Sequence, residues 1–119
     1  MAVQIAGTRQ TMADSYKNIA GSGAPYVALY TGNPGASGNS NEVTGGTPAY
    51  ARKQTTWTSG SGGALSGTSV TIDVPAGTYT YAGIWTAASG GSCIDWVAIT
   101  STTLGAQGQI VVTPSFTQT

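Results

Sequence analysis

The feature that most constrains the fold is an uncharged stretch at residues 77–91, GTYTYAGIWTAASGG. Residues 78–86 are β-branched, aromatic or small, which is typical of a β-strand. Strict alternation would place Ala82 and Ile84 on one face and Tyr79, Tyr81 and Trp85 on the other. Because neither face carries a charge, we expect a central strand that is covered on both sides.

The segments around this strand also have the pattern of short strands. A Ser-Gly-Gly turn follows it, and residues 93–100 (CIDWVAIT) return as its hairpin partner. In residues 69–74, Val70, Ile72 and Val74 alternate with polar residues and are expected to point inward. Glycine- and proline-rich turns bound the other expected strands, at residues 26–31, 50–57, 64–74, 109–113 and 115–117. This series predicts an all-β fold, an antiparallel β-sandwich of the jelly-roll type.

One segment has a helical pattern, at residues 8–20. Thr8 is the expected N-cap, and Met12, Tyr16, Ile19 and Ala20 recur at helical spacing and are expected to form the buried face. The length of 119 residues predicts a single β-sandwich domain over residues 1–119, in which residues 1–24 form an N-terminal arm and helix. We expect this helix to cover the sandwich or to reach a neighbouring subunit.

Charge is scarce and balanced. Lys and Arg number 4, Asp and Glu number 4, and charged residues make up 7% of the chain. Binding of nucleic acid or an anionic membrane requires clustered basic residues, so neither partner is expected. No apolar run is long enough to cross a bilayer, and the N-terminus lacks a secretory signal, so we expect the chain to be made in a cytoplasm and to be exported, if at all, as part of something larger. A surface with so little charge favours association, so we expect a homo-oligomer.

The composition argues against catalysis. The chain has no histidine, which removes the commonest general base and metal ligand. Its single cysteine, Cys93, has no imidazole to activate it, and the four carboxylates show no spacing that suggests a catalytic pair. We therefore expect no enzymatic activity, no cofactor and no metal. Oxygens of Asn33, Asn39, Asn41 and Glu42 could approach a calcium ion, but their spacing does not match an EF-hand, and a hydrated loop is the favoured interpretation.

The three tryptophans allow two interpretations. Trp57, Trp85 and Trp96, together with several tyrosines, could stack on the rings of a cell-surface carbohydrate. They could instead fill the core and subunit interfaces, where aromatic residues are enriched. We favour the second interpretation, because Trp85 and Trp96 lie within apolar strands.

A long polar loop is the candidate site for partner binding. Residues 32–48 are rich in Gly, Asn and Pro, and loops of this length tend to be functional or disordered. An aromatic residue and half of the basic residues follow the loop directly. Tyr and Arg are favoured at protein interfaces. The residues predicted to contact a partner protein are Asn41, Glu42, Tyr50, Arg52 and Lys53.

Several short motifs in a fixed order resemble a known family. They cover residues 29–35 (LYTGNPG), 41–46 (NEVTGG), 50–52 (YAR), 56–57 (TW), 83–85 (GIW) and 87–91 (AASGG). In this order they are similar to small virion structural proteins of tailed phages, such as those of actinobacteria, which are labelled tail-fibre or minor structural proteins. The resemblance implies a non-enzymatic β-domain of the virion and supplies no catalytic residues.

The resemblance leaves two functions open. A short chain with one domain and no stalk suits a capsid decoration protein, a minor capsid protein that stabilises the assembled shell, and we slightly favour this function. The alternative is a tail-fibre or tail-tip protein that contributes to host attachment and could do so by binding a cell-surface carbohydrate. In either case the partners are major capsid or tail proteins, and analogy with the family favours a homotrimer.

Overall fold

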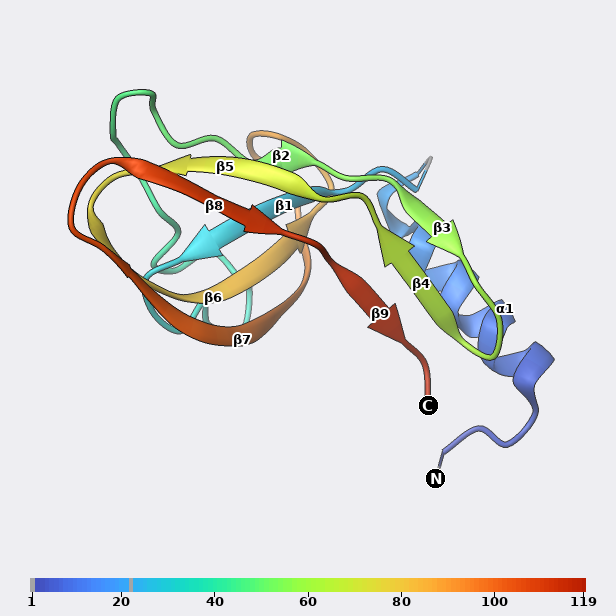
Figure 1. Ribbon diagram of the computed structural model, residues 1–119. Coiled ribbons are helices and arrows are strands. Elements are labelled where there is room, and N and C mark those ends of the chain that lie inside the picture. The colour runs from blue at the N-terminus through green and yellow to red at the C-terminus, as the bar shows by residue number, and fades with distance from the viewer. Residues whose placement is uncertain (1, 22) are drawn as a thin grey trace.

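The computed structural model describes residues 2–21 and 23–119 and is dominated by β-strands (Figure 1). Helix α1 (Ala6–Lys17) and the 3₁₀-helix η1 (Asn18–Ala20) precede all of the strands. The strands are β1 (Tyr26–Tyr30), β2 (Lys53–Gln54), β3 (Trp57–Ser59), β4 (Ala64–Gly67), β5 (Val70–Val74), β6 (Gly77–Trp85), β7 (Cys93–Leu104), β8 (Gly108–Val112) and β9 (Ser115–Thr117). The predicted all-β antiparallel sandwich with one short N-terminal helix is confirmed.

The strands form three antiparallel sheets. A four-stranded sheet in the order β2-β1-β6-β7 packs against the two-stranded sheet β5-β8. The third sheet, β3-β4-β9, extends from one end of this sandwich, and α1 packs on it (Figure 1). Helix α1 and strand β9 lie at this end, away from the turns at the opposite end of the sandwich.

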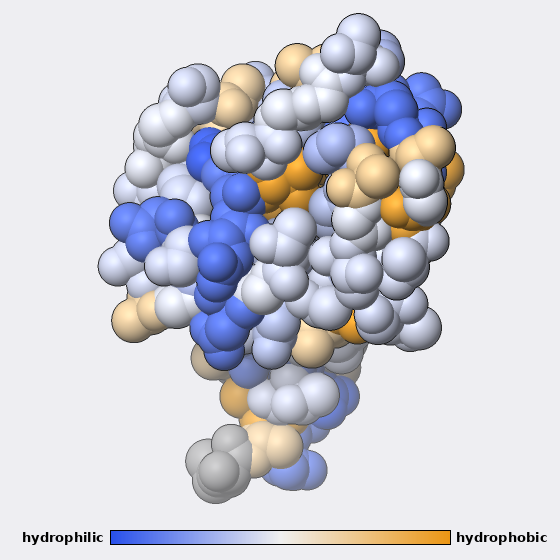
Figure 2. Space-filling view, turned by 90° about the vertical axis from the view of Figure 1, so that its left-hand side faces the viewer, coloured by the Kyte–Doolittle hydropathy of each residue, from blue (hydrophilic) through white to orange (hydrophobic). Residues whose placement is uncertain are grey.

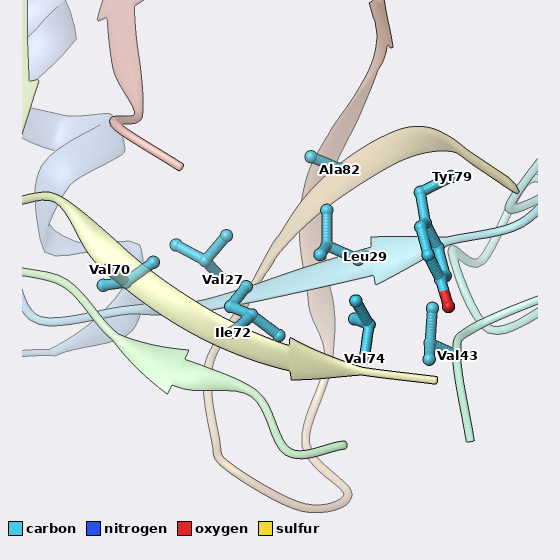
Figure 3. Packing of buried hydrophobic residues seen from close by; sticks show 8 residues of the cluster. All are labelled: Val27, Leu29, Val43, Val70, Ile72, Val74, Tyr79 and Ala82. Atoms are coloured by element: carbon cyan, nitrogen blue, oxygen red, sulfur yellow. The ribbon is translucent and has the colours of Figure 1, made fainter. Parts of the chain in front are cut away.

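The main core lies between the four-stranded and the two-stranded sheet. Side chains from β1, β5 and β6 meet there and are buried (Figure 3). The buried cluster consists of Val27, Leu29, Val43, Val70, Ile72, Val74, Tyr79 and Ala82. Val70, Ile72 and Val74 point inward, as their alternation predicts.

Strand β6 is central, as predicted from residues 77–91. It pairs with β1 on one side and with β7 on the other, and β7 is the expected hairpin partner. One detail of the prediction is wrong: Tyr79 does not share a face with Tyr81 and Trp85. The pairing with β7 shifts register between Tyr79 and Tyr81, and this irregularity turns Tyr79 into the main core beside Ala82.

The helix differs from its prediction at its start and in its buried face. It begins at Ala6 after Ile5, so Thr8 lies inside it and is not the N-cap. Ala13 is fully buried against the third sheet, whereas Met12 and Ile19, predicted to face inward, are 42% and 54% exposed.

Two predicted strands are each divided in two. Residues 50–57 contain only the short β2 and the start of β3, and residues 64–74 divide into β4 and β5. The chain bends at these breaks because the strands pass from the sandwich into the third sheet. Thr55 is buried at the first break, and its hydroxyl donates a 2.7 Å hydrogen bond to the Thr68 carbonyl at the second, which ties the two bends together.

Candidate functional site

The loop between β1 and β2 folds back along β1. The Thr31 amide donates to the Asn41 carbonyl, and the Val43 amide donates to the Leu29 carbonyl. Asn41 takes a positive φ of 62°, which asparagine tolerates better than most residues and which turns the chain here. These bonds place Glu42 opposite Tyr30, at the edge of the sandwich.

Glu42 and Arg52 form a bidentate ion pair. Arg52 donates from Nε to Oε2 and from Nη2 to Oε1 of Glu42, both at 2.8 Å, which is the strongest geometry for this pair. Tyr50 donates its hydroxyl to Oε2 of Glu42 at 2.7 Å and accepts a hydrogen bond from the Leu29 amide. The carboxylate therefore joins the middle of the long loop to its C-terminal end, and the Tyr50 hydroxyl joins that end to β1.

The remaining donors of Arg52 reach a second loop. Its Nη1 donates to the carbonyls of Ala87 and Gly90, each at 3.0 Å. Its guanidinium carbon lies 3.7 Å from the ring centroid of Trp85, which is cation–π geometry. Four residues, Glu42, Tyr50, Arg52 and Trp85, are linked by these contacts, and we call them the Arg52 network. Through Arg52 the network contacts the turn after β6 as well as the long loop.

The electrostatics of the Arg52 network favour the charged pair. Burial raises the pKa of the Glu42 carboxyl, but the hydrogen bonds from Arg52 and Tyr50 outweigh burial and hold that pKa below its usual value. The bond to Glu42, opposed by burial, raises the pKa of Arg52. Burial and the Glu42 carboxylate both raise the pKa of Tyr50, so its hydroxyl stays protonated and acts as a donor.

A second set of contacts lies directly behind the Arg52 network. Trp85 donates from Nε1 to the Tyr30 hydroxyl, and that hydroxyl donates to the Gly38 carbonyl, both at 2.7 Å. Gly38 takes a φ of +71°, and a Cβ there would overlap with the side chain of Cys93. Burial raises the pKa of the Cys93 thiol, which opposes formation of a reactive thiolate.

The structure unites three of the five predicted partner-binding residues. Glu42, Tyr50 and Arg52 bond to one another, so their polar groups are occupied within the chain. Asn41 is exposed, and its amide donates to the Asn33 carbonyl. Lys53 is half-buried in β2. Contact of these five residues with a partner stays a prediction.

The three tryptophans lie in different surroundings. Trp85 is 5% exposed and is covered by Arg52, and Trp57 is 6% exposed beneath the helix. Trp96 is half-buried, packs edge-on against Tyr81 and donates to the Gly35 carbonyl. They do not form one exposed platform for a sugar. The sequence indicated apolar surroundings for Trp85, but no local signal predicted that Arg52 would cover it.

The alternative of a calcium site at the long loop gains no support from the geometry. Asn33 Oδ1 accepts the Gly35 amide, and both oxygens of Glu42 accept from Arg52. Within residues 2–21 and 23–119, no three His, Cys, Asp or Glu side chains gather as they would around a metal ion. In that same part of the chain, no helix has the length and apolar character that crossing a membrane requires.

An apolar groove of about 460 Å³ separates the sandwich from the helical end. It exists because two strands, β5 and β8, cannot cover the inner face of a four-stranded sheet, so Val97 on β7 stays 63% exposed. Tyr16 and Phe116, stacked 3.8 Å apart, form the wall on the helical side. Sequence reasoning missed this groove, since it depends on how many strands each sheet receives.

The opposite end of the sandwich, where its turns lie, has a different surface. Figure 2 looks onto this end, which consists mostly of residues of intermediate hydropathy, with a band of hydrophilic residues and a hydrophobic depression. Gln107 joins two of the loops there, since its side chain accepts from the Thr47 amide and donates to the Pro48 carbonyl. Gln107 therefore ties the turn between β7 and β8 to the long loop through amide contacts.

Comparison with known proteins gave one finding. Neither the curated proteins nor the solved structures contain a match to this chain. A family model described as podophage GP4 fiber I protein gp80 matches residues 8–117. The match begins inside α1 and includes every strand. It agrees with the resemblance to phage structural proteins. It does not support an origin in actinobacterial phages or a role as a minor capsid protein. The chain belongs to the family of podophage GP4 fiber I protein gp80 and is a phage fibre-type structural protein.

Proposed function

We propose that this chain is a subunit of a phage tail fibre and contributes to attachment of the virion to its host. The observation that carries the proposal is the family match over residues 8–117, whose description names a fibre protein of a podophage. This favours the tail-fibre alternative over capsid decoration, which we preferred on the sequence alone.

The construction of the long loop supports a role in contact between proteins. The Arg52 network holds the loop to β1 through a bond of 3.2 Å and to the turn after β6 through two bonds of 3.0 Å. A partner that meets a surface held in this way loses little conformational entropy of the loop on binding. We propose that the exposed side chains above the network, among them Asn39 and Asn41, contact a neighbouring virion protein.

Gold-labelled antibody on intact virions tests the location. We expect label on the tail and, by quantitative mass spectrometry, a copy number far below that of the major capsid protein. Label distributed over the head, at a copy number comparable with the capsid protein, would overturn the proposal and restore capsid decoration.

A point substitution tests the loop better than a deletion, because Gly38 and Gly35 contribute to the contacts of Tyr30 and Trp96. Asn39→Arg adds a large charged side chain at an exposed position and should reduce incorporation into virions without changing the unfolding midpoint. Thr58→Arg, on an exposed position of β3, is the matched control. Equal incorporation of both variants would place the contact elsewhere.

A further inference from the structure

We propose that the apolar groove beside β8 binds an extended segment of a different protein, which adds to the sandwich as one further strand. Sheet β5-β8 covers the four-stranded sheet only in part, since β5 contacts β2 at one edge and β7 forms the other edge. Figure 1 shows β7 on the side of β8 away from β5. In the described part of the chain, no strand pairs with β8 on that side.

The groove lies at this position. Residues of β6 and β7, among them Ala82, Val97 and Ile99, line one side of it, and residues 112–116, at the end of β8 and beyond, line another. Val97 pairs with Ala82 on β6, yet Val97 is 63% exposed whereas Ala82 is 7% exposed. A strand laid along β8 would place every second side chain over Val97 and Ile99. It would therefore continue the main core to the edge of the four-stranded sheet.

The strands that border the groove have free edges. Among the described residues, β8 pairs only with β5, and β7 pairs only with β6. Natural sheets protect such edges with charged residues or proline. Strand β8 contains neither, and the 12 residues of β7 include only Asp95. A small molecule could fill a groove of about 460 Å³, but it would leave the edge of β8 unpaired. An extended peptide pairs with the edge while its alternate side chains enter the groove.

The charge at the groove indicates a basic residue in the bound segment. Asp95 is the one charged side chain among the residues that line the groove, and it is exposed. Within the described residues it forms no ion pair with Lys or Arg. Its carboxylate accepts from the Tyr16 hydroxyl on α1 at 3.4 Å and from the Trp96 amide at 2.9 Å. An extended segment with Lys or Arg at its end near α1 would therefore complement the groove in charge as well as in shape.

This requirement favours a different protein over a second copy of the chain. The basic residues of the chain are Arg9, Lys17, Arg52 and Lys53. Arg9 and Lys17 belong to α1. Arg52 is bound to Glu42, and Lys53 lies in β2, which is already paired with β1. Because none of the four lies in a free extended segment, another copy does not carry the complementary strand.

Selection from a random heptapeptide library on the purified full chain tests this inference. We expect enriched peptides in which apolar and polar residues alternate, with Lys or Arg near one end and no proline. They should bind the wild type and not Val97→Lys, because a long charged side chain would then lie in the groove. Val111→Lys is the matched control and should bind like the wild type: Val111 is 66% exposed, and its neighbours Ile110 and Val112 are the residues of β8 that pack on the main core. Both variants should keep the circular dichroism spectrum of the wild type.

Two further measurements on an enriched peptide, by fluorescence polarisation, test how it binds. Successive backbone amides of a strand point to opposite edges, so N-methylation of alternate amides blocks one edge at a time. One of the two methylated forms should lose affinity by about tenfold or more, and the other should not. Asp95→Asn should reduce the preference of the groove for Lys over Glu at the end of the peptide.

Four outcomes would overturn the inference. They are a library that yields no peptide able to distinguish the wild type from Val97→Lys, enriched sequences without alternation, equal loss of binding in Val111→Lys, and methylated forms that both bind like the unmodified peptide. An unchanged preference for Lys in Asp95→Asn would remove the reason for choosing a different protein over a second copy. None of these results depends on whether the protein lies on the head or the tail.

Discussion

The long loop and the helix differ in whether their side chains find contacts within the chain. The loop has almost no regular structure, yet its charged and aromatic groups are paired within the chain through the Arg52 network. The helix is regular, yet it leaves Ile5, Met12 and Ile19 in solvent. The sequence led us to expect the reverse, with a loop that needs a neighbour and a helix that buries its apolar side chains.

The difference teaches that regular backbone structure and the pairing of side chains within the chain are separate properties. Hydrogen bonds within a helix satisfy its backbone wherever the helix is placed, and they do not decide where its side chains go. An irregular loop must find partners for its backbone and side chains together, and when it finds them in the same chain it needs no other protein. The following predictions test this comparison.

The largest expected effect is at Trp85. Trp85→Ala removes a side chain that is 5% exposed, its bond to Tyr30 and the ring beneath Arg52. It should lower the free energy of unfolding by about 3–5 kcal/mol, measured by urea denaturation. Trp85→Phe keeps an aromatic ring and should lose much less. If Trp85→Ala unfolds at the wild-type midpoint, the loop does not depend on the network.

Removal of Arg52 should cost less. Arg52→Ala leaves the Glu42 carboxylate, whose side chain is 20% exposed, with Tyr50 as its remaining partner. We expect a loss of about 2–3 kcal/mol in the free energy of unfolding, the usual result of leaving a largely buried charge without its pair. Lys53→Ala, one residue along, should change it by less than about 0.5 kcal/mol. Equal effects at both positions would show that Arg52 is an ordinary surface residue.

The same pair predicts a dependence on acid. The pKa of Glu42 is lower in the folded chain than its usual value of 4.5, so its stabilising contribution is fully present above pH 4.5. The contribution is lost as the pH falls through the lowered pKa, because the carboxyl takes up a proton and its attraction to Arg52 ends. The urea midpoint of the wild type should therefore fall more steeply below pH 4.5 than that of Glu42→Gln. Parallel curves for the two proteins would contradict this prediction.

The smallest effect is expected on the helix. Gly7 lies in α1, and a Cβ there would meet no other atom within 4 Å. Gly7→Ala should therefore raise the free energy of unfolding by about 0.4–1 kcal/mol at protein concentrations where the chain is monomeric. Gly38→Ala, in the loop, should have the opposite sign because of its φ of +71° and its overlap with Cys93. If Gly7→Ala destabilises the isolated chain, the outer face of α1 is already covered within it.

The sequence predicted those parts of the fold that depend on nearby residues. Alternation in Val70, Ile72 and Val74 identified a core-facing strand, and the glycine turn after Trp85 identified the hairpin of β6 and β7. It could not predict the irregular pairing at Tyr79 or the burial of Ala13 in place of Met12. Both are decided by the shape of a surface that other strands build.

The candidate site divides in the same way. Their position directly after the long loop identified Tyr50 and Arg52 as residues of interest, because Tyr and Arg are favoured at protein interfaces. Their bonds to Glu42 and to the carbonyls of Ala87 and Gly90 join segments far apart in the chain. No spacing pattern in the sequence indicates that these segments contact one another. The assignment to a phage fibre family was predictable in outline, because it rested on several motifs in a fixed order.

The direct contact between Arg52 and Glu42 has a consequence for the salt tolerance of the long loop. Attraction between exposed charges is screened beyond a Debye length of about 8 Å at physiological ionic strength, whereas partly buried pairs are screened much less. The side chains of Arg52 and Glu42 are 9% and 20% exposed, and their charged atoms lie 2.8 Å apart. The loop should therefore keep its shape in concentrated salt as well as in the dilute water that a particle meets after leaving its host.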